Sequence, residues 1–312
     1  MSNEPTPIAD PLKAVMARIE AKRGKSVEEH AQDVAAEVHA EIAPAGKLPP
    51  EQGWIVFAPV PSDLCRVSPF FPLGKAEIAH RPFIEDLVIA KSSWGELRYT
   101  GPKLDTFVED VFLAVLALVD DPAERARAEA EGSSPMTWSG TIGQILALMG
   151  LTDGAANYAR VRRAFKLMRS TTFEITLKSG RVEGCGLLGN YGFDLKTKRA
   201  TVTVDPVFHE LYSRGSVTRL DVERRSKLSG AVAKCVYRFA MSHRKDRWDG
   251  HWMTLARSVN LPLDKPDKEL RRMLRTAIKA MVKAGVLTKA SKLEGDVVTL
   301  VRLARSLPHR AP

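Results

Sequence analysis

A chain of 312 residues, of which 44% are hydrophobic, can build the cores of two ordinary domains and a tail. No apolar run approaches the roughly eighteen residues of a membrane span, and Met1–Pro7 lack the basic and apolar regions of a signal peptide. Cys65, Cys185 and Cys235 lie far apart without metal-ligand spacing, which indicates reduced thiols in a cytoplasmic protein.

The net charge of +10 is concentrated in the C-terminal third of the chain. Residues 206–312 carry 23 Lys and Arg against 10 Asp and Glu, whereas residues 1–205 carry 24 against 27. This asymmetry is typical of a protein in which one domain dominates contact with a polyanion. The basic helix in this region has an ordinary apolar side without aromatic anchors, so we expect nucleic acid rather than a membrane surface.

In chain order, residues 1–52 begin with prolines and continue as two polar, Ala-rich pieces near 11–21 and 27–42. We expect a tail that is largely disordered or marginally helical. After a Pro-rich lead-in, the pattern predicts strands at 84–90 and 96–99. A helix that Asp105 or Thr106 can cap follows them and ends before Pro122.

A first helix-turn-helix is predicted from Thr141–Met149, the glycine at position 150 and a second helix over 155–168. One face of the second helix is basic, with Arg162, Arg163, Lys166 and Arg169. Strands at 173–178, 182–188 and 200–204 follow, and we expect them to form a β-hairpin wing. The basic turn before the last strand contributes Lys196, Lys198 and Arg199.

The second half repeats this scheme, with helices predicted at 226–242, 251–259 and 268–283. On the last helix, six cations gather on one side, namely Lys268, Arg271, Arg272, Arg275, Lys279 and Lys283. Leu270, Leu274 and Met281 lie on the other side, which makes the helix amphipathic. A charged turn and an apolar run at 297–301 follow and predict a second wing.

These patterns predict an α+β fold with two tandem winged-helix domains, at 53–205 and 206–312, after the tail. In a winged helix the second helix of the helix-turn-helix enters the major groove of DNA and the wing touches phosphate. Arg271, Arg272 and Arg275 are therefore candidates for guanine contacts, with Arg272 and Arg275 favoured, because arginine can bond O6 and N7 together. The lysines are expected at phosphates. The alternative is that these cations form an ordinary solvated surface.

Several short segments resemble TrfA-like plasmid replication initiators, within the iteron-binding Rep proteins. They are Arg98–Asp105 followed by Asp110-Val111-Phe112, then Leu148–Gly154, and Thr172–Ile175, and the resemblance covers roughly residues 65–205. It implies a bacterial protein that binds direct repeats (iterons) of double-stranded DNA at a plasmid origin and helps to open adjacent A·T-rich DNA. It also implies recruitment of host replication proteins, such as the helicase, its loader or the host initiator. Finally, it implies a homodimer through the first winged helix that represses the protein's own gene.

The sequence lacks the motifs of an enzymatic initiator. No phosphate-binding loop of the Gly-x-x-x-x-Gly-Lys-Ser/Thr type occurs, and the seven histidines are scattered. We therefore expect no catalytic residue, no metal and no cofactor. Two alternatives stay open: a winged-helix transcriptional repressor, whose surfaces would be the same, and a rolling-circle initiator that nicks DNA.

Overall fold

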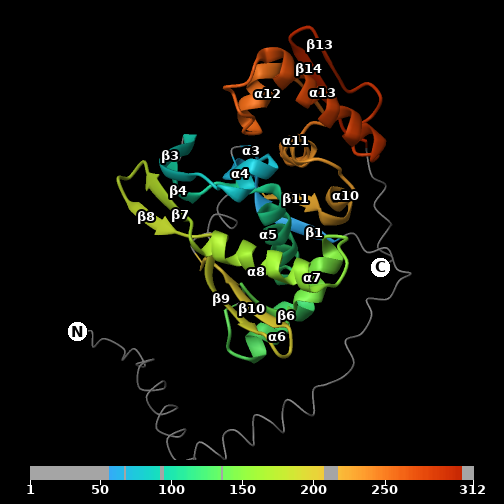
Figure 1. Ribbon diagram of the computed structural model, residues 1–312. Coiled ribbons are helices and arrows are strands. Elements are labelled where there is room, and N and C mark those ends of the chain that lie inside the picture. Colours follow the sequence, from blue (N-terminus) through green and yellow to red (C-terminus); the bar gives the residue numbers. More distant parts are fainter. Residues whose placement is uncertain (1–55, 67, 92–94, 135, 207–216, 304–312) are drawn as a thin grey trace, which may run out of the picture. The chain divides into compact units, whose positions relative to one another are not determined.

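The computed structural model describes residues 56–66, 68–91, 95–134, 136–206 and 217–303 (Figure 1). The tail predicted at 1–52 lies outside these residues. The described part combines short helices with small, mostly antiparallel sheets, which confirms the predicted α+β class. The described residues form one compact unit, and the boundary predicted at 205/206 stays a prediction.

Helix α5 (Thr106–Val119) forms the centre of the hydrophobic core. It is buried on nearly all sides, as expected for a helix whose sequence is apolar all round. The helix begins where predicted, because Asp105 Oδ1 accepts a hydrogen bond from the Val108 amide at 2.9 Å. Strand β1 (Phe57–Pro61) packs on α5 and pairs with β11 (Val217–Asp221), so the Pro-rich lead-in is joined to the second half of the chain.

The first winged helix consists of β6 (Thr137–Thr141), α7 (Ile142–Leu148), α8 (Ala155–Arg169), β9 (Leu188–Asp194) and β10 (Arg199–Val204). Helices α7 and α8 form the predicted helix-turn-helix. The hairpin β9–β10 is the first wing, and β6 completes a sheet of order β6-β10-β9. Strand β6 was not predicted from the sequence.

The second winged helix consists of β12 (Arg247–His251), α12 (Trp252–Ser258), α13 (Asp267–Lys283), β13 (Lys292–Glu294) and β14 (Val297–Val301). Its hairpin β13–β14 is the second wing, and the sheet order β12-β14-β13 matches that of the first winged helix. Figure 1 shows both groups, the first in green and yellow and the second in orange and red. Two tandem winged helices are therefore present, as predicted.

The two winged helices share local details that recur 110 residues apart. A Trp-x-Gly sequence forms the short first strand at Trp138 and again at Trp248. The turn of each helix-turn-helix begins with a left-handed residue, Gly150 at φ 66° and Asn260 at φ 55°. In each case the next residue, a leucine, donates its amide to a carbonyl five residues back at 2.9 Å. The repetition is thus a property of backbone geometry as well as of element order.

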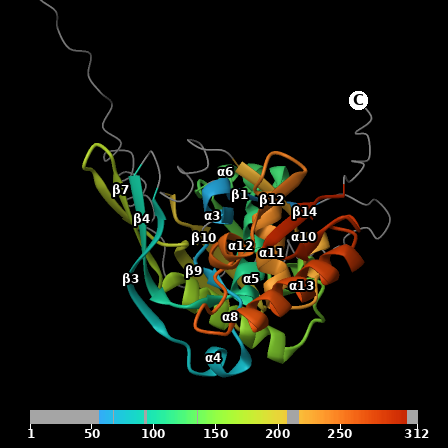
Figure 2. The same ribbon diagram turned by 90° about the horizontal axis from the view of Figure 1, so that it is seen from above.

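The strands assigned to the first wing are partly wrong. Strands β7 (Thr172–Leu177) and β8 (Val182–Cys185) were expected in the first wing, but they form a separate sheet of order β3-β4-β7-β8. Their partners are β3 (Phe83–Lys91) and β4 (Gly95–Pro102), and Figure 2 shows β3, β4 and β7 side by side. The alternation in β7 therefore fits a sheet in which β3 and β4 come from much earlier in the chain.

The remaining elements connect these parts. They are α3 (Ser62–Arg66), β2 (Phe70–Phe71), α4 (Lys75–Ala79), β5 (Leu104–Asp105), α6 (Pro122–Ala130), α10 (Val222–Ser226) and α11 (Ala231–Met241). The helix predicted over 226–242 corresponds to α11, which begins only at Ala231, whereas α10 ends at Ser226 and was not predicted. The break between the two helices falls before Gly230, which has a positive φ of 93° and precedes the first turn of α11.

Candidate nucleic-acid interface

Helix α13 presents the cationic face that the sequence predicts. Leu270, Leu274 and Met281 are buried, together with Ala277 and Ile278, and they hold the helix against the core. The cations that lie exposed on its other side are Lys268, Arg272, Arg275, Lys279 and Lys283. Five of the six predicted residues therefore form one solvent-facing surface that a polyanion can reach.

Arg271, the sixth predicted residue, is engaged inside the protein. Its Nη1 donates to the Gly295 carbonyl oxygen at 2.6 Å, and its Nη2 forms an ion pair with Asp296. The guanidinium carbon lies 4.4 Å from the centre of the Trp252 ring. Arg271 thus joins α13 to the tip of the second wing and to α12, and it is not free to reach a base edge in this arrangement.

Helix α8 presents the second predicted cationic face. Val161, Phe165 and Met168 are buried, whereas all four predicted cations are exposed, namely Arg162, Arg163, Lys166 and Arg169. The buried positions 161, 165 and 168 have the same spacing as 274, 278 and 281 of α13. Matching them places Arg162 at the position of Arg275, and Lys166 at that of Lys279. The two recognition helices therefore carry a cation of the same type at each of two equivalent positions.

The turn of the first wing is basic, as predicted. Lys196, Lys198 and Arg199 are all exposed. The side chain of Asp194 shapes the turn by accepting hydrogen bonds from the amides of Lys196 at 2.8 Å and Thr197 at 3.2 Å. Hydrogen bonding to Thr197 and to these amides holds the pKa of the Asp194 carboxyl below its ordinary value. Lys198 has a left-handed backbone (φ 57°), and its Nζ lies 5.3 Å from the centre of the Tyr158 ring on α8.

A cleft of about 510 Å³ lies between α8 and the first wing. Tyr158 and Arg162 line it from the helix, and Phe193 and Lys198 line it from the wing. The Arg162 guanidinium carbon is 5.7 Å from the centre of the Phe193 ring. The lining therefore combines aromatic rings and cations with the carboxyl groups of Asp153 and Asp194.

The tip of the second wing, which was predicted only as a charged turn, is acidic. Between β13 and β14 the chain runs Glu294-Gly295-Asp296, so that carboxylates stand where the first wing has amines. The Glu294 side chain forms an ion pair with Lys292. The hydrogen bond from Arg271 is the main reason that the pKa of the Asp296 carboxyl lies below its ordinary value. The basic contribution of the second winged helix thus comes from α13 rather than from its wing.

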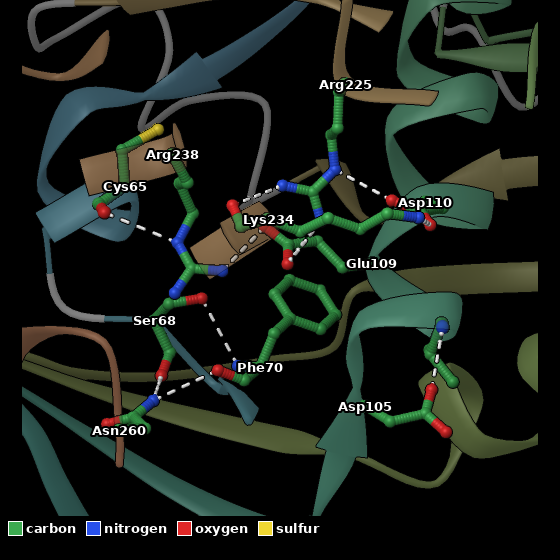
Figure 3. A network of polar contacts seen from close by, with 11 residues as sticks. Cys65, Ser68, Phe70, Asp105, Glu109, Asp110, Arg225, Lys234, Arg238 and Asn260 are labelled. Carbon is green, nitrogen blue, oxygen red and sulfur yellow. Dashed lines mark hydrogen bonds and ion pairs between the residues drawn. The ribbon is translucent and has the colours of Figure 1, made fainter. Parts of the chain in front are cut away.

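Buried ion pairs connect α5 with α10 and α11 (Figure 3). The Glu109 carboxylate accepts from Arg225 Nη2 at 2.8 Å and from Arg238 Nη1 at 2.7 Å, and all three residues are 1% exposed. Asp110 Oδ1 accepts from Arg225 Nε at 2.7 Å, and Lys234 pairs with Asp110 as well. Burial disfavours the charged form of Glu109, but the two guanidinium groups outweigh burial, so the pKa of its carboxyl lies below the ordinary value. No local pattern predicts this cluster, because its carboxylates and its cations lie 115 or more residues apart.

A second connection runs from the turn of the second helix-turn-helix to the lead-in. Asn260 Nδ2 donates to the carbonyl oxygens of Ser68 at 2.6 Å and Phe70 at 3.1 Å. The same residue supplies the left-handed backbone of the turn. These bonds hold the second helix-turn-helix to the lead-in. The ion pairs around Glu109 hold α10 and α11, which precede the second winged helix in the chain, to α5.

In the part of the chain that the structure describes, no three or more His, Cys, Asp or Glu side chains gather as metal ligands do, and no helix is long and apolar enough to cross a bilayer. Cys65, Cys185 and Cys235 are buried and unpaired with one another. Burial raises the pKa of the Cys65 and Cys185 thiols to about 12 and that of Cys235 to about 11.

The fold is shared with a solved protein. The crystal structure of RctB domains 2–3 matches 73% of this chain and 96% of its own, with a TM-score of 0.50 and 11% identity. The selenomethionine form of RctB domains 2 and 3 matches 71% and 92%, with a TM-score of 0.49 and 13% identity. Pi initiator protein in complex with iteron DNA matches 64% and 91%, with a TM-score of 0.46 and 16% identity. No family model and no curated protein sequence matches the chain.

Proposed function

We propose that this protein is a replication initiator that binds direct repeats at a plasmid origin through both winged helices. The observation that carries the proposal is the pair of exposed cationic recognition helices, α8 and α13, with Arg162 and Arg275 at equivalent positions. A helix of this kind reads the major groove with its exposed side chains while lysines hold phosphates. Two such helices in one chain suit a site that is longer than a single major-groove contact.

The replication role itself rests on the resemblance of residues 65–205 to TrfA-like initiators. Opening of A·T-rich DNA, recruitment of a host helicase or its loader, and repression of the protein's own gene by a homodimer belong to the same proposal. So do a bacterial cytoplasmic location and the absence of catalysis. The initiator would act by binding and bending or opening DNA, without a nucleotide or a metal of its own.

Footprinting of the purified full-length protein on its own plasmid DNA, without nucleotide or metal, tests the proposal. We expect protection of regularly phased direct repeats beside an A·T-rich segment. Protection of a single inverted repeat at a promoter would favour a transcriptional repressor. The absence of sequence-specific protection at moderate salt would refute DNA reading altogether. Metal-dependent nicking of supercoiled origin DNA would instead favour the rolling-circle alternative.

Arg275→Ala separates base reading from phosphate binding. If Arg275 bonds guanine, the variant should lose about 1–3 kcal/mol on the repeat sequence and become less selective at one base position. Lys279→Ala is the matched control, because it removes a neighbouring exposed cation that is expected at phosphate. An equal loss for Arg275→Ala on every DNA sequence would show that this residue contacts phosphate only.

A further inference from the structure

The tips of the two wings occupy the same place in the two winged helices. The Lys198 carbonyl oxygen accepts a hydrogen bond from the Ile142 amide, at the start of α7, at 3.2 Å. The Asp296 carbonyl oxygen accepts one from the Trp252 amide, at the start of α12, at 2.9 Å. Because both tips are tied to the same point of the helix-turn-helix, Lys198 and Asp296 are equivalent positions with opposite charges.

In the first winged helix, the space between the recognition helix and the wing is the cleft of about 510 Å³ described above. Lys198 and Arg162 are exposed residues of its lining, and the rings of Tyr158 and Phe193 form part of its walls. Asp153 and Asp194 also line it, and the Asp194 carboxylate is bonded to amides of the wing turn. Lys198 supplies the cation that attracts phosphate, whereas Arg162 is expected at a base edge. Aromatic rings pack against the apolar faces of sugars, so a segment of sugar–phosphate backbone can contact both Lys198 and the rings.

In the second winged helix, Arg271 spans the corresponding space. The matching of buried positions in the two recognition helices places Arg271 where the first has Tyr158. Its guanidinium lies on the Trp252 ring and bonds Gly295 and Asp296 of the wing tip. The tip carries two carboxylates, Glu294 paired with Lys292 and Asp296 paired with Arg271, and it offers no cation in the position of Lys198. A carboxylate beside phosphate costs binding energy through repulsion.

We propose that the two winged helices bind DNA asymmetrically. The first seats the sugar–phosphate backbone of one strand in the cleft between α8 and its wing. The second contacts DNA through α13, without its wing, and Arg271 acts as a positioning residue that holds that wing against α13. This inference rests on the proposed function, because it takes α8 and α13 to face DNA.

Two substitutions, each changing the formal charge by one unit at a wing tip, test the asymmetry. Lys198→Asn removes a cation from the first wing, and asparagine tolerates the left-handed backbone at this position. Glu294→Gln removes an exposed carboxylate from the second wing. The affinity of the full-length protein for the repeat DNA is measured over a series of salt concentrations. Unfolding midpoints of both variants, expected to equal that of the wild type, show that folding is intact.

If one phosphate lies at Lys198, the negative slope of log K against log salt, where K is the binding constant, should become less steep by about 0.9 in Lys198→Asn. It should also weaken binding to matched and mismatched DNA by the same factor. Glu294→Gln should leave both the slope and the affinity unchanged. An unchanged slope for Lys198→Asn, or a several-fold gain in affinity for Glu294→Gln, would overturn the asymmetry while leaving the initiator proposal intact. A wild-type protein that binds no repeat DNA would instead refute the proposed function.

Discussion

Replacing Glu109 by Gln removes the charge from a carboxylate that two buried guanidinium groups share. The carboxylate oxygens lie 2.8 Å from Arg225 Nη2 and 2.7 Å from Arg238 Nη1. In the variant, an amide NH₂ group must face one of these donors. Arg225 would still donate from Nε to Asp110 Oδ1 at 2.7 Å. Arg238 would still donate from Nε to the Cys65 carbonyl oxygen, but this bond is longer, at 3.3 Å.

Breaking a buried ion pair by removing one partner typically costs about 3–5 kcal/mol, because the other charge stays buried without compensation. We expect Glu109→Gln to lose free energy of unfolding in this range. Equilibrium unfolding in urea, followed by circular dichroism, measures the loss. Glu294→Gln is the control, because it breaks a solvent-exposed pair with Lys292 and should leave the unfolding midpoint unchanged. A loss below about 1 kcal/mol for Glu109→Gln would refute the view that this cluster stabilises the junction of α5 with α10 and α11.

Three further predictions follow from the same structure. The pKa of Glu109 is lower in the folded protein than its ordinary value of 4.5. The stability that this carboxylate contributes is therefore fully present above pH 4.5 and is lost as the pH falls through the folded-state pKa. In Glu109→Gln this loss of stability at acid pH should be smaller when unfolding is measured across pH. Gly140→Ala should destabilise the protein by about 1–3 kcal/mol, since the new Cβ would overlap the fully buried Trp138 ring. Gly250→Ala should cost less, because the Trp248 ring that its Cβ would meet is partly exposed and can shift. Equal decreases in the unfolding temperature of the two variants would contradict this. The three thiols, whose pKa values burial raises to about 11–12, should resist iodoacetamide at pH 8 and react only in denaturant, as mass spectrometry would detect.

The sequence predicted the recognition helices well, for a physical reason. Their register is set by a local pattern, in which Leu270 and Leu274 alternate with cations at helical spacing. The cap of α5 at Asp105 is equally local. Such features depend on residues within one or two turns, so they can be derived without knowledge of the fold.

Strands β6 and β12 were missed because each is short and ends near a glycine, which reads as a turn. A signal was nevertheless present in the sequence. The Trp-x-Gly pattern recurs at Trp138 and Trp248, the same distance apart as the left-handed residues Gly150 and Asn260. An internal comparison of the two halves would have shown that both helix-turn-helix segments begin with a strand.

Other features depend on pairings that no local pattern contains. Arg271 has the same spacing as the exposed cations of α13, and its contacts with Asp296, Gly295 and Trp252 distinguish it from Arg275. Strand β7 alternates as a wing strand would, but its partner β4 lies far upstream. The ion pairs of Glu109 with Arg225 and Arg238 likewise arise only when distant segments pack together.

Contact mapping at base resolution on one repeat most directly tests the central claim that both recognition helices read DNA. Wild type, Arg162→Ala and Arg275→Ala are compared by methylation interference at guanine N7. Because these two arginines hold equivalent positions on α8 and α13, each variant should lose contacts in a different half of the same repeat. If Arg162→Ala leaves every contact in place, or if both variants lose the same bases, the claim that the two winged helices share one repeat is contradicted.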